Sequence, residues 1–325
     1  MRLGICERGW TRPGADVRSL VQEMVDSARH VEQLGFGRFW LGEHHHVQTG
    51  WTVPDTLVSL VGAATSRITI GIGGVLMTGR NPYRTALDMA LLASAFPGRF
   101  EFGIGRSTFG GNTLCLAGED DRAIAVDTTR YERRAATLLR CLGIDIDIDG
   151  LSNESAHHDA FELQPRPAAP PLPWLLGTST SSMQIAARWG LPFACVHNAV
   201  AAQVVVEYRR TFRPSAVLAK PRCMVSVQGV FGRSREHAAQ HTIRHPDGSP
   251  TVETYARHEA RELFARLFEI YQPDEFIYTD FCADPAERRE TYSAIAHQTA
   301  DLVDGEHRSA GNRTAPVAVA QLMPA

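Results

Sequence analysis

The chain alternates between apolar segments of strand length and segments with helical periodicity along nearly all of its 325 residues. Eight such β/α units in succession are typical of a closed (β/α)₈ barrel, the TIM barrel of the α/β class. A doubly wound open sheet is the alternative, because periodicity does not show whether a sheet closes. Strands are predicted at 2–6, 39–42, 67–77, 98–105, 173–177, 191–197, 222–231 and 275–282.

Helices are predicted between these strands, and two segments interrupt the alternation. The helices cover 17–34, 55–65, 82–96, 120–142, a segment from about 181, 199–212 and 285–303. Residues 143–171, after the fourth helix, are expected to form a hairpin excursion. Residues 236–270, between the seventh and eighth strands, are expected to be a long loop, with the polar part 241–250 as a mobile lid. One domain is predicted over 1–304, and a disordered tail over 305–325.

Composition excludes several classes of function. The formal net charge of −3 gives no reason to expect nucleic-acid binding, and no run of 18 apolar residues predicts a membrane span. The N-terminus resembles a first strand rather than a signal peptide, and the six cysteines form no CxxC pair. We therefore expect a cytoplasmic protein with reduced thiols. Lys220, the only lysine, precedes a proline, so Schiff-base chemistry and a Walker phosphate loop are not predicted.

The second predicted strand ends in Glu43-His44-His45-His46. Imidazoles titrate near neutral pH, and in a (β/α)₈ barrel the carboxyl ends of the strands carry the chemistry. A solvated polar turn is the alternative interpretation. Consecutive strand residues point to opposite faces, so the three histidines cannot easily converge on one ion, and no metal site is predicted.

Four separated motifs then carry a resemblance to the bacterial luciferase-like flavin-dependent monooxygenases. They lie at 35–45, at 65–71 with Asn81-Pro82, at 98–106 and at 173–192, in the order and at a spacing similar to those of the family. The resemblance covers about residues 1–230 well and the last β/α unit weakly. It implies a barrel that binds FMN, reduced by a separate flavin reductase. O₂ and the reduced flavin would then oxidise a small organic substrate through a flavin hydroperoxide. It also implies a homodimer formed through helices of the first half, with 82–96 as a candidate contributor.

The resemblance assigns catalytic and substrate roles. His44 matches the family's general base, with an orienting hydrogen bond as its alternative role. His45 and Glu43 are predicted to hold the His44 ring in one tautomer. His197 and Asn198 end the sixth strand and predict hydrogen bonding to the substrate, or merely a cap on the strand.

Cofactor contacts are predicted at three strand ends and on one helix. Arg106 follows the fourth strand, and Arg130, on the next long helix, matches the family's second phosphate-binding arginine. Residues Thr178, Ser179 and Ser182 begin a helix whose backbone N–H groups attract an anion, and N-capping is compatible with that role. Gly73-Gly74 lies where family members can carry a non-proline cis peptide beneath the flavin ring. Thr108 replaces the third glycine of a nicotinamide fingerprint, so that cofactor is not predicted.

Two other functions remain open on the same barrel. One is hydride transfer with a deazaflavin coenzyme. The other is a flavin-binding protein without catalysis, which the retained His44 argues against. An unrelated barrel hydrolase would need a carboxylate pair, and Glu43 and Glu101 offer none that is convincing.

Overall fold

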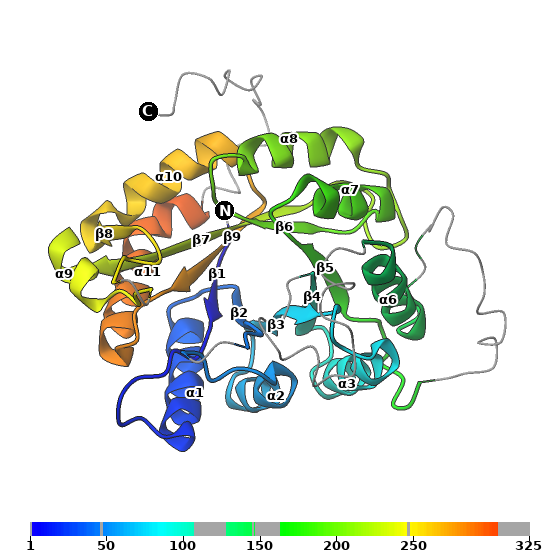
Figure 1. Cartoon of the computed structure of the whole chain (residues 1–325), viewed down its shortest axis with the longest axis horizontal. Coiled ribbons are helices and arrows are strands. Elements are labelled where there is room, and N and C mark those ends of the chain that lie inside the picture. The colour runs from blue at the N-terminus through cyan, green and yellow to red at the C-terminus, as the bar shows by residue number, and fades with distance from the viewer. Residues whose placement is uncertain are drawn as a thin grey trace.

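Eight parallel strands form a closed barrel with the helices packed outside it (Figure 1). The computed structural model describes residues 2–45, 48–106, 128–144, 146, 163–245 and 248–304. The strands are β1 (Arg2–Glu7), β2 (Arg38–Leu41), β3 (Thr69–Leu76), β4 (Phe100–Gly105), β5 (Leu172–Leu176), β6 (Phe193–Val196), β7 (Cys223–Gly232), β8 (Thr254–Ala256) and β9 (Glu275–Asp280). The helices are α1 (Val17–Gln33), α2 (Pro54–Ala64), α3 (Pro82–Ala95), α6 (Thr128–Cys141), α7 (Thr180–Trp189), α8 (Ala201–Thr211), α9 (Arg235–His241), α10 (Ala260–Tyr271) and α11 (Pro285–Asp304), with a 3₁₀ turn η1 (Arg257–Glu259) before α10.

The sheet runs β6-β5-β4-β3-β2-β1-β9-β7-β8, and a further pairing of β6 with β7 closes it. All of these pairings are parallel. Closure excludes the doubly wound alternative and confirms the predicted barrel. The short strand β8 lies outside the ring, where it extends the far end of β7 at Val230–Gly232.

Local sequence signals explain the helix ends that flank the site. The Asp16 carboxylate accepts a hydrogen bond from the backbone N–H of Ser19 and begins α1. Asn81 caps α3 in the same way, and Pro82 occupies its first turn. At α7, Ser179 is the N-cap, and Gly190, with φ of 62°, takes the left-handed conformation that ends the helix.

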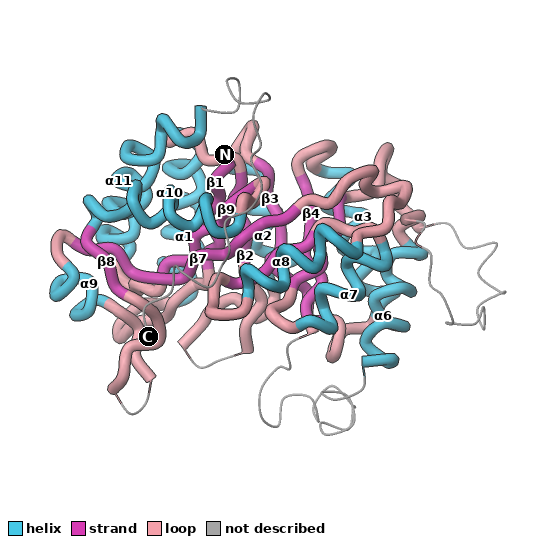
Figure 2. Tube along the Cα trace, turned by 90° about the horizontal axis from the view of Figure 1, so that it is seen from above, coloured by secondary structure: helices cyan, strands magenta, loops and turns pink. Residues whose placement is uncertain are grey.

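One part of the sequence prediction is wrong. The segment 236–270, expected to be a long loop, contains most of α9, all of β8 and nearly all of α10 (Figure 2). Apolar residues at helical spacing bury one face of α10. An isolated antiparallel bridge from Thr242 to Cys282 joins the described part of the supposed lid to the chain just after β9, and a second, from Arg244 to Pro250, lies within it. Most of the predicted hairpin excursion, at 145 and 147–162, lies outside the described residues, as does the tail 305–325; the described part at 163–171 contains no strand.

A polar cluster is buried between the barrel and α11. It contains Asp280 at the end of β9, Glu7 at the end of β1 and Arg288 of α11, each less than 5% exposed. One Asp280 oxygen accepts from the Cys282 N–H at 2.9 Å, while the other has no hydrogen-bond partner among the described residues. Burial raises the pKa of Asp280 to about 7, although Arg288 opposes the shift.

This raised pKa predicts a pH dependence of stability. The native state holds the Asp280 proton more tightly than the unfolded chain, so the favourable contribution is complete below about pH 4. It is lost as the pH rises through about 7. The variant Asp280→Asn lacks this titration. Its stability relative to the wild type should therefore rise by roughly 2–3 kcal/mol between pH 5 and pH 8. Urea denaturation of both proteins at each pH measures the difference, and a constant difference would contradict the buried-acid interpretation.

Candidate active site

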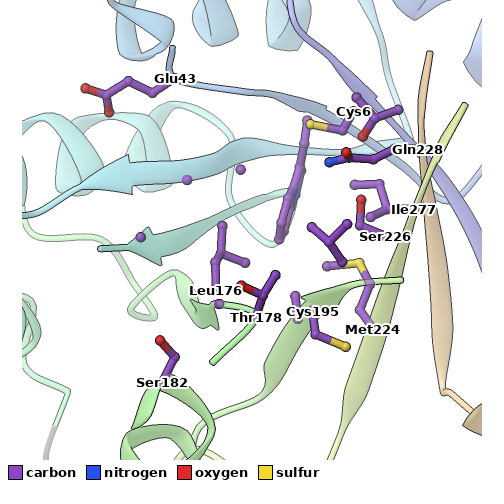
Figure 3. Close-up of a pocket in the computed structure, with 18 of the residues that line it drawn as sticks. Cys6, Glu43, Leu176, Thr178, Ser182, Cys195, Met224, Ser226, Gln228 and Ile277 are labelled. Atoms are coloured by element: carbon purple, nitrogen blue, oxygen red, sulfur yellow. The ribbon is translucent and has the colours of Figure 1, made fainter. Parts of the chain in front are cut away.

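A pocket of about 480 Å³ opens at the carboxyl ends of the barrel strands, where (β/α)₈ enzymes carry their active sites. Its volume lies within the range typical of small-molecule and cofactor sites. All eight barrel strands contribute to the lining. Figure 3 shows Gln228 and Ser226 of β7 on the same wall as Ile277 of β9, with Met224 and Cys195 nearby.

A buried aromatic layer forms the floor of the pocket. The Trp40 ring lines the pocket and packs edge-on against Trp174, with ring centroids 6.1 Å apart. Both indole N–H groups donate to Glu101, at 2.9 Å from Trp40 and 3.1 Å from Trp174. Beneath them Arg38 pairs with both Glu101 and Glu275. The Glu101 carboxylate is therefore neutralised below the floor, which agrees with the prediction that it forms no catalytic pair with Glu43.

Gly73 and Gly74 present bare backbone to the pocket. The peptide bond between them is cis, so the predicted geometry is confirmed, and the pairing of β3 with β4 shifts register across the same residues. A Cβ on Gly73 would collide with the Trp40 ring, and one on Gly74 would lie 2.5 Å from the Gly103 carbonyl oxygen. Only glycine fits at either position, and the backbone is left open to a flat ligand.

His44 lies in the pocket, and its ring contacts Arg8, which follows β1. The Arg8 Nε lies 2.7 Å from Nε2 of His44, and Nη2 lies 3.1 Å from Nδ1. Arginine only donates hydrogen bonds, so the shorter contact makes Nε2 the acceptor of a neutral ring and leaves the ring proton on Nδ1. The 3.1 Å approach of Nη2 to Nδ1 is then no hydrogen bond, and an imidazolium would set a second donor, Nε2–H, against Nε of Arg8. The contact therefore favours the neutral ring and must open before Nε2 takes up a proton.

Aromatic rings hold Arg8 in place. The guanidinium carbon lies 5.3 Å from the Trp10 ring centroid and 4.9 Å from that of Phe281. These are cation–π distances, and they fix the side chain that contacts His44. Sequence reasoning missed Arg8, although it directly follows a barrel strand just as Arg106 does.

Glu43 and His45 make their contacts on another side of the strand end. The Glu43 carboxylate accepts from the Leu76 N–H at 3.0 Å, pairs with Arg80 at 2.9 Å and lies 3.1 Å from Nε2 of His45. Figure 3 shows Glu43 turned away from the other labelled residues. His45 faces a groove between α2 and α3 and is absent from the pocket lining. Arg8 contacts the His44 ring, whereas Glu43, which also lines the pocket, and His45 join β2 to β3 and, through Arg80, to α2.

Polar groups suited to an anion lie at one side of the pocket. Arg106, Thr178, Ser179 and Ser182 all line it. Ser179 caps α7 by accepting from the Ser182 N–H, and its hydroxyl lies 3.1 Å from that of Ser182. A Cβ on Gly177 would lie 2.5 Å from the Ser182 hydroxyl, so glycine allows this close approach. The helix dipole adds a partial positive charge here.

Three of the predicted contact residues are not part of the pocket lining. Arg130 lies in the first turn of α6. Nδ1 of His197 lies 2.7 Å from the Tyr271 hydroxyl on α10, which occupies one of its ring nitrogens. The Asn198 side chain accepts from the Val200 N–H and donates to the Val196 carbonyl, which closes the turn before α8. Both strand-six residues thus fit the capping alternative better than substrate contact.

The polar wall of the pocket comes from β7 and β9 rather than from the end of β6. Ser226 and Gln228 of β7 and Thr279 of β9 line the pocket, and sequence reasoning named none of them. Their alternation with apolar residues along β7 was the available signal. Cys6 also lines the pocket, but burial raises the pKa of its thiol to about 11, so it stays protonated and is a poor nucleophile.

Two further expectations from the sequence concern the state of the cysteines and the presence of membrane spans. Five cysteines fall within the described ranges, and all are free thiols. Among the helices that the structure describes, none combines the length and the apolar character needed to cross a membrane.

Comparisons with known structures show the same architecture. The chain is similar to apo-MsnO8 with a TM-score of 0.78 and 23% identity, over 92% of this chain and 98% of that one. It is also similar to the oxygenating constituent of 3,6-diketocamphane monooxygenase from Pseudomonas putida in complex with FMN (TM-score 0.70, 15% identity, 93% and 98% covered). An F420-dependent secondary alcohol dehydrogenase matches with a TM-score of 0.67 and 13% identity, over 90% and 98%. The second of these structures contains FMN, and the third contains an F420–acetone adduct.

Sequence comparison gives the family. A protein named luciferase-like monooxygenase from Escherichia coli (strain K12) is 31% identical over 239 residues, which is 69% of this chain and 65% of that protein. The chain thus spans just under two thirds of the length of that relative. The family model described as luciferase-like monooxygenase matches residues 1–275. This match covers most of the chain and includes every strand of the barrel up to the start of β9, so the chain belongs to the luciferase-like monooxygenase family.

Proposed function

We propose that the chain is the oxygenase of a two-component FMN-dependent monooxygenase, which oxygenates a small organic substrate with O₂. One observation carries the proposal. A single pocket joins an anion-binding side, made by Arg106 and the start of α7, to the His44–Arg8 pair, with bare Gly73–Gly74 backbone also in its lining.

The pocket fits a phosphorylated flavin in two respects. Arg106 and the N-terminus of α7, with Ser179 and Ser182, offer donors to a phosphate group. The Gly73–Gly74 backbone lines the pocket without side chains, which suits the face of a planar ring. Bound reduced FMN would supply the electrons that activate O₂. The chain's own residues would hold the flavin, shield it and manage protons.

His44 is the proposed proton carrier. Its neutral ring accepts from Arg8 through Nε2, so uptake of a proton at that atom requires Arg8 to withdraw. The ring can therefore exist in two states, one closed on Arg8 and one open to the reacting groups. The polar wall of Ser226, Gln228 and Thr279 would hydrogen-bond a substrate that carries polar groups.

Two partners belong to the proposal. A separate flavin reductase would deliver reduced FMN, because the chain lacks a nicotinamide fingerprint. A second copy of the chain would pack on the first-half helices, where Tyr83 and Leu91 of α3 are exposed apolar side chains. Sedimentation of the purified protein tests the dimer.

Replacing Arg106 with alanine should lower the affinity for FMN but not the affinity for riboflavin. We expect the affinity for reduced FMN to fall by about tenfold or more, because a charge-assisted contact to phosphate is lost. The affinity for reduced riboflavin, which has no phosphate, should stay within about twofold. Anaerobic equilibrium dialysis of both ligands measures this. Arg84→Ala, on the exposed face of α3, is the matched control.

The same titration tests the alternatives. Equal losses for FMN and riboflavin would place Arg106 away from the phosphate. Binding of reduced F420 with no binding of FMN would move the assignment to hydride transfer. Tight FMN binding without oxygenation of any compound in a broad substrate panel would favour a flavin-binding protein without catalysis.

A further inference from the structure

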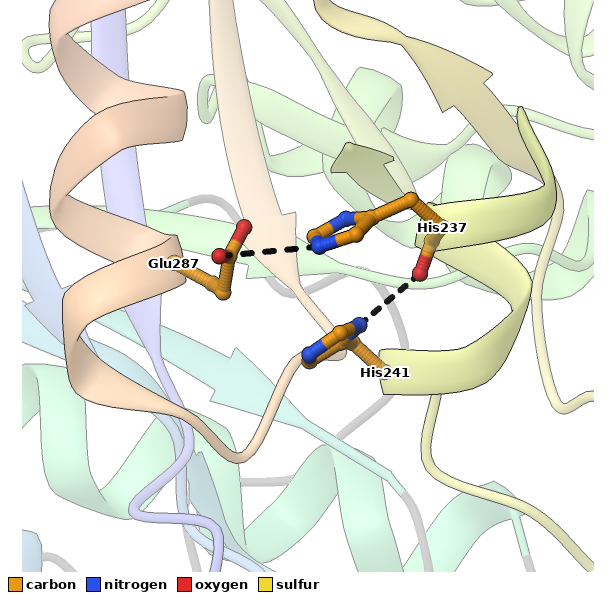
Figure 4. Close-up of side chains that lie close together, drawn as sticks. All are labelled: His237, His241 and Glu287. Carbon is orange, nitrogen blue, oxygen red and sulfur yellow. Dashed lines mark hydrogen bonds and ion pairs between the residues drawn. The ribbon is translucent and has the colours of Figure 1, made fainter. Parts of the chain in front are cut away.

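We propose that His237, His241 and Glu287 form a site for a divalent transition metal ion, with Zn²⁺ as the ion best suited to it. The two histidines lie four residues apart on α9 and Glu287 lies on α11, so two elements far apart in sequence converge (Figure 4). The site lies outside the active-site pocket and is independent of the proposed oxygenase function.

The ligand atoms are already close together. One nitrogen of each histidine and one oxygen of Glu287 all lie within 4.8 Å of one another. Nε2 of His237 lies 3.8 Å from Oε1 of Glu287, which is too long for a hydrogen bond. Ligand atoms in a tetrahedral zinc site lie about 3.3 Å apart, given metal–ligand bonds of about 2.0 Å. Small side-chain rotations would therefore bring the three atoms onto one ion.

The hydrogen bonds around the cluster prepare these atoms for a metal. Nδ1 of His241 donates to the His237 carbonyl at 2.8 Å, which leaves the lone pair of the neutral ring on Nε2. Arg257 binds Oε2 of Glu287 at 2.5 Å and leaves Oε1 directed at His237. Such second contacts orient ligands in known metal sites.

An ordinary ion pair explains the cluster less well. The 3.8 Å separation of the His237 ring nitrogen Nε2 from the Glu287 oxygen Oε1 lies beyond hydrogen-bond range. The two imidazoles also stack with centroids 4.2 Å apart, and Nδ1 of His237 is buried with no hydrogen-bond partner among the described residues. The two rings and the Glu287 oxygen that Arg257 does not bind thus offer three ligand atoms to one metal ion.

The donor set selects the kind of ion. Two imidazoles and a carboxylate suit Zn²⁺, which often takes three protein ligands and a water molecule. Ca²⁺ and Mg²⁺ prefer oxygen ligands and should bind poorly. A bound ion would join α9 to α11 and thereby fasten the segment between β7 and β9 to the last helix. We therefore expect bound metal to stabilise the folded chain and to take no part in catalysis.

Zinc binding to the full chain provides the test. Protein stripped with a chelator should take up one Zn²⁺ per chain in equilibrium dialysis. Zinc at about a hundred times the dissociation constant should raise the melting temperature by about 5 °C. His241→Asn should weaken zinc binding by at least about tenfold, because losing an outer contact alone costs that much. Mg²⁺ at the same concentration should produce no shift.

His297→Asn, an exposed histidine on α11, is the matched control and should bind zinc like the wild type. Circular dichroism and the melting temperature without metal show whether His241→Asn is folded; if it is not, Glu287→Gln replaces it in the same assay. The proposal fails if the stripped wild type takes up no zinc. It fails equally if the folded variants keep the same stoichiometry and affinity, since the zinc then binds elsewhere.

Discussion

Replacing Glu101 with alanine is expected to lower the free energy of unfolding by about 3–5 kcal/mol. Inside the barrel the positive charges of Arg38 and Arg222 are balanced by the negative charges of Glu101 and Glu275. The guanidinium nitrogens lie within hydrogen-bond distance of the carboxylate oxygens. Removing Glu101 leaves one positive charge in excess in a buried site. It also leaves the indole N–H groups of Trp40 and Trp174 without their acceptor.

Equilibrium urea denaturation measures the effect. Glu207→Ala, which removes one partner of an exposed pair with Arg210 on α8, should leave the denaturation midpoint unchanged. Combining Glu101→Met with Arg38→Met removes one charge of each sign and should recover part of the loss, because an apolar pair replaces an unbalanced charge. A loss below about 1 kcal/mol for Glu101→Ala would show that water reaches the site and solvates Arg38.

The strand and helix order was predictable because each unit carries its own periodicity. The described ends of β3 and α3 fall within two residues of the prediction, since Asn81-Pro82 marks the start of the helix. α10 was missed because the polar, turn-rich run 241–250 precedes it, and the whole segment 236–270 was assigned to a loop from that composition although residues of α10 show apolar helical spacing. Barrel closure could not be read locally, since it depends on the pairing of the first strand, β1, with the last barrel strand, β9, where Arg2 lies opposite Glu275.

The site was predictable where a short motif carries it and not where distant strands meet. His44, Arg106, Ser179 and Ser182 line the pocket as expected. Arg8 directly follows β1, but its partner lies 36 residues away, and residue spacing does not show that contact. His197 and Asn198 were assigned to the substrate because both are polar residues at a strand end. Their hydrogen bonds to Tyr271 and to the turn before α8 could not be seen from spacing.

Replacing His44 with glutamine should lower the rate of substrate oxygenation by about 10²–10⁴-fold, which is the usual contribution of a general acid–base group. Glutamine can still accept from Arg8, so the affinity for reduced FMN should change little. The measurement is product formation at saturating reduced FMN, for whichever compound of a screened panel the wild type oxygenates. His45→Gln is the matched comparison, because that neighbouring ring contacts Glu43 but is absent from the pocket lining, and its loss should cost less than tenfold.

The variant Arg8→Met distinguishes two possible roles of His44, which are to carry a proton or to orient a group through a hydrogen bond. If His44 carries a proton, Arg8→Met removes a cation that opposes protonation of the ring, and the acidic limb of the rate profile should move to higher pH. If His44 only orients a group through a hydrogen bond, Arg8→Met should lower the rate at every pH without moving that limb. His44→Gln would then retain most of its activity. The two variants together therefore decide whether the Arg8–His44 contact controls proton transfer or only holds the ring in position.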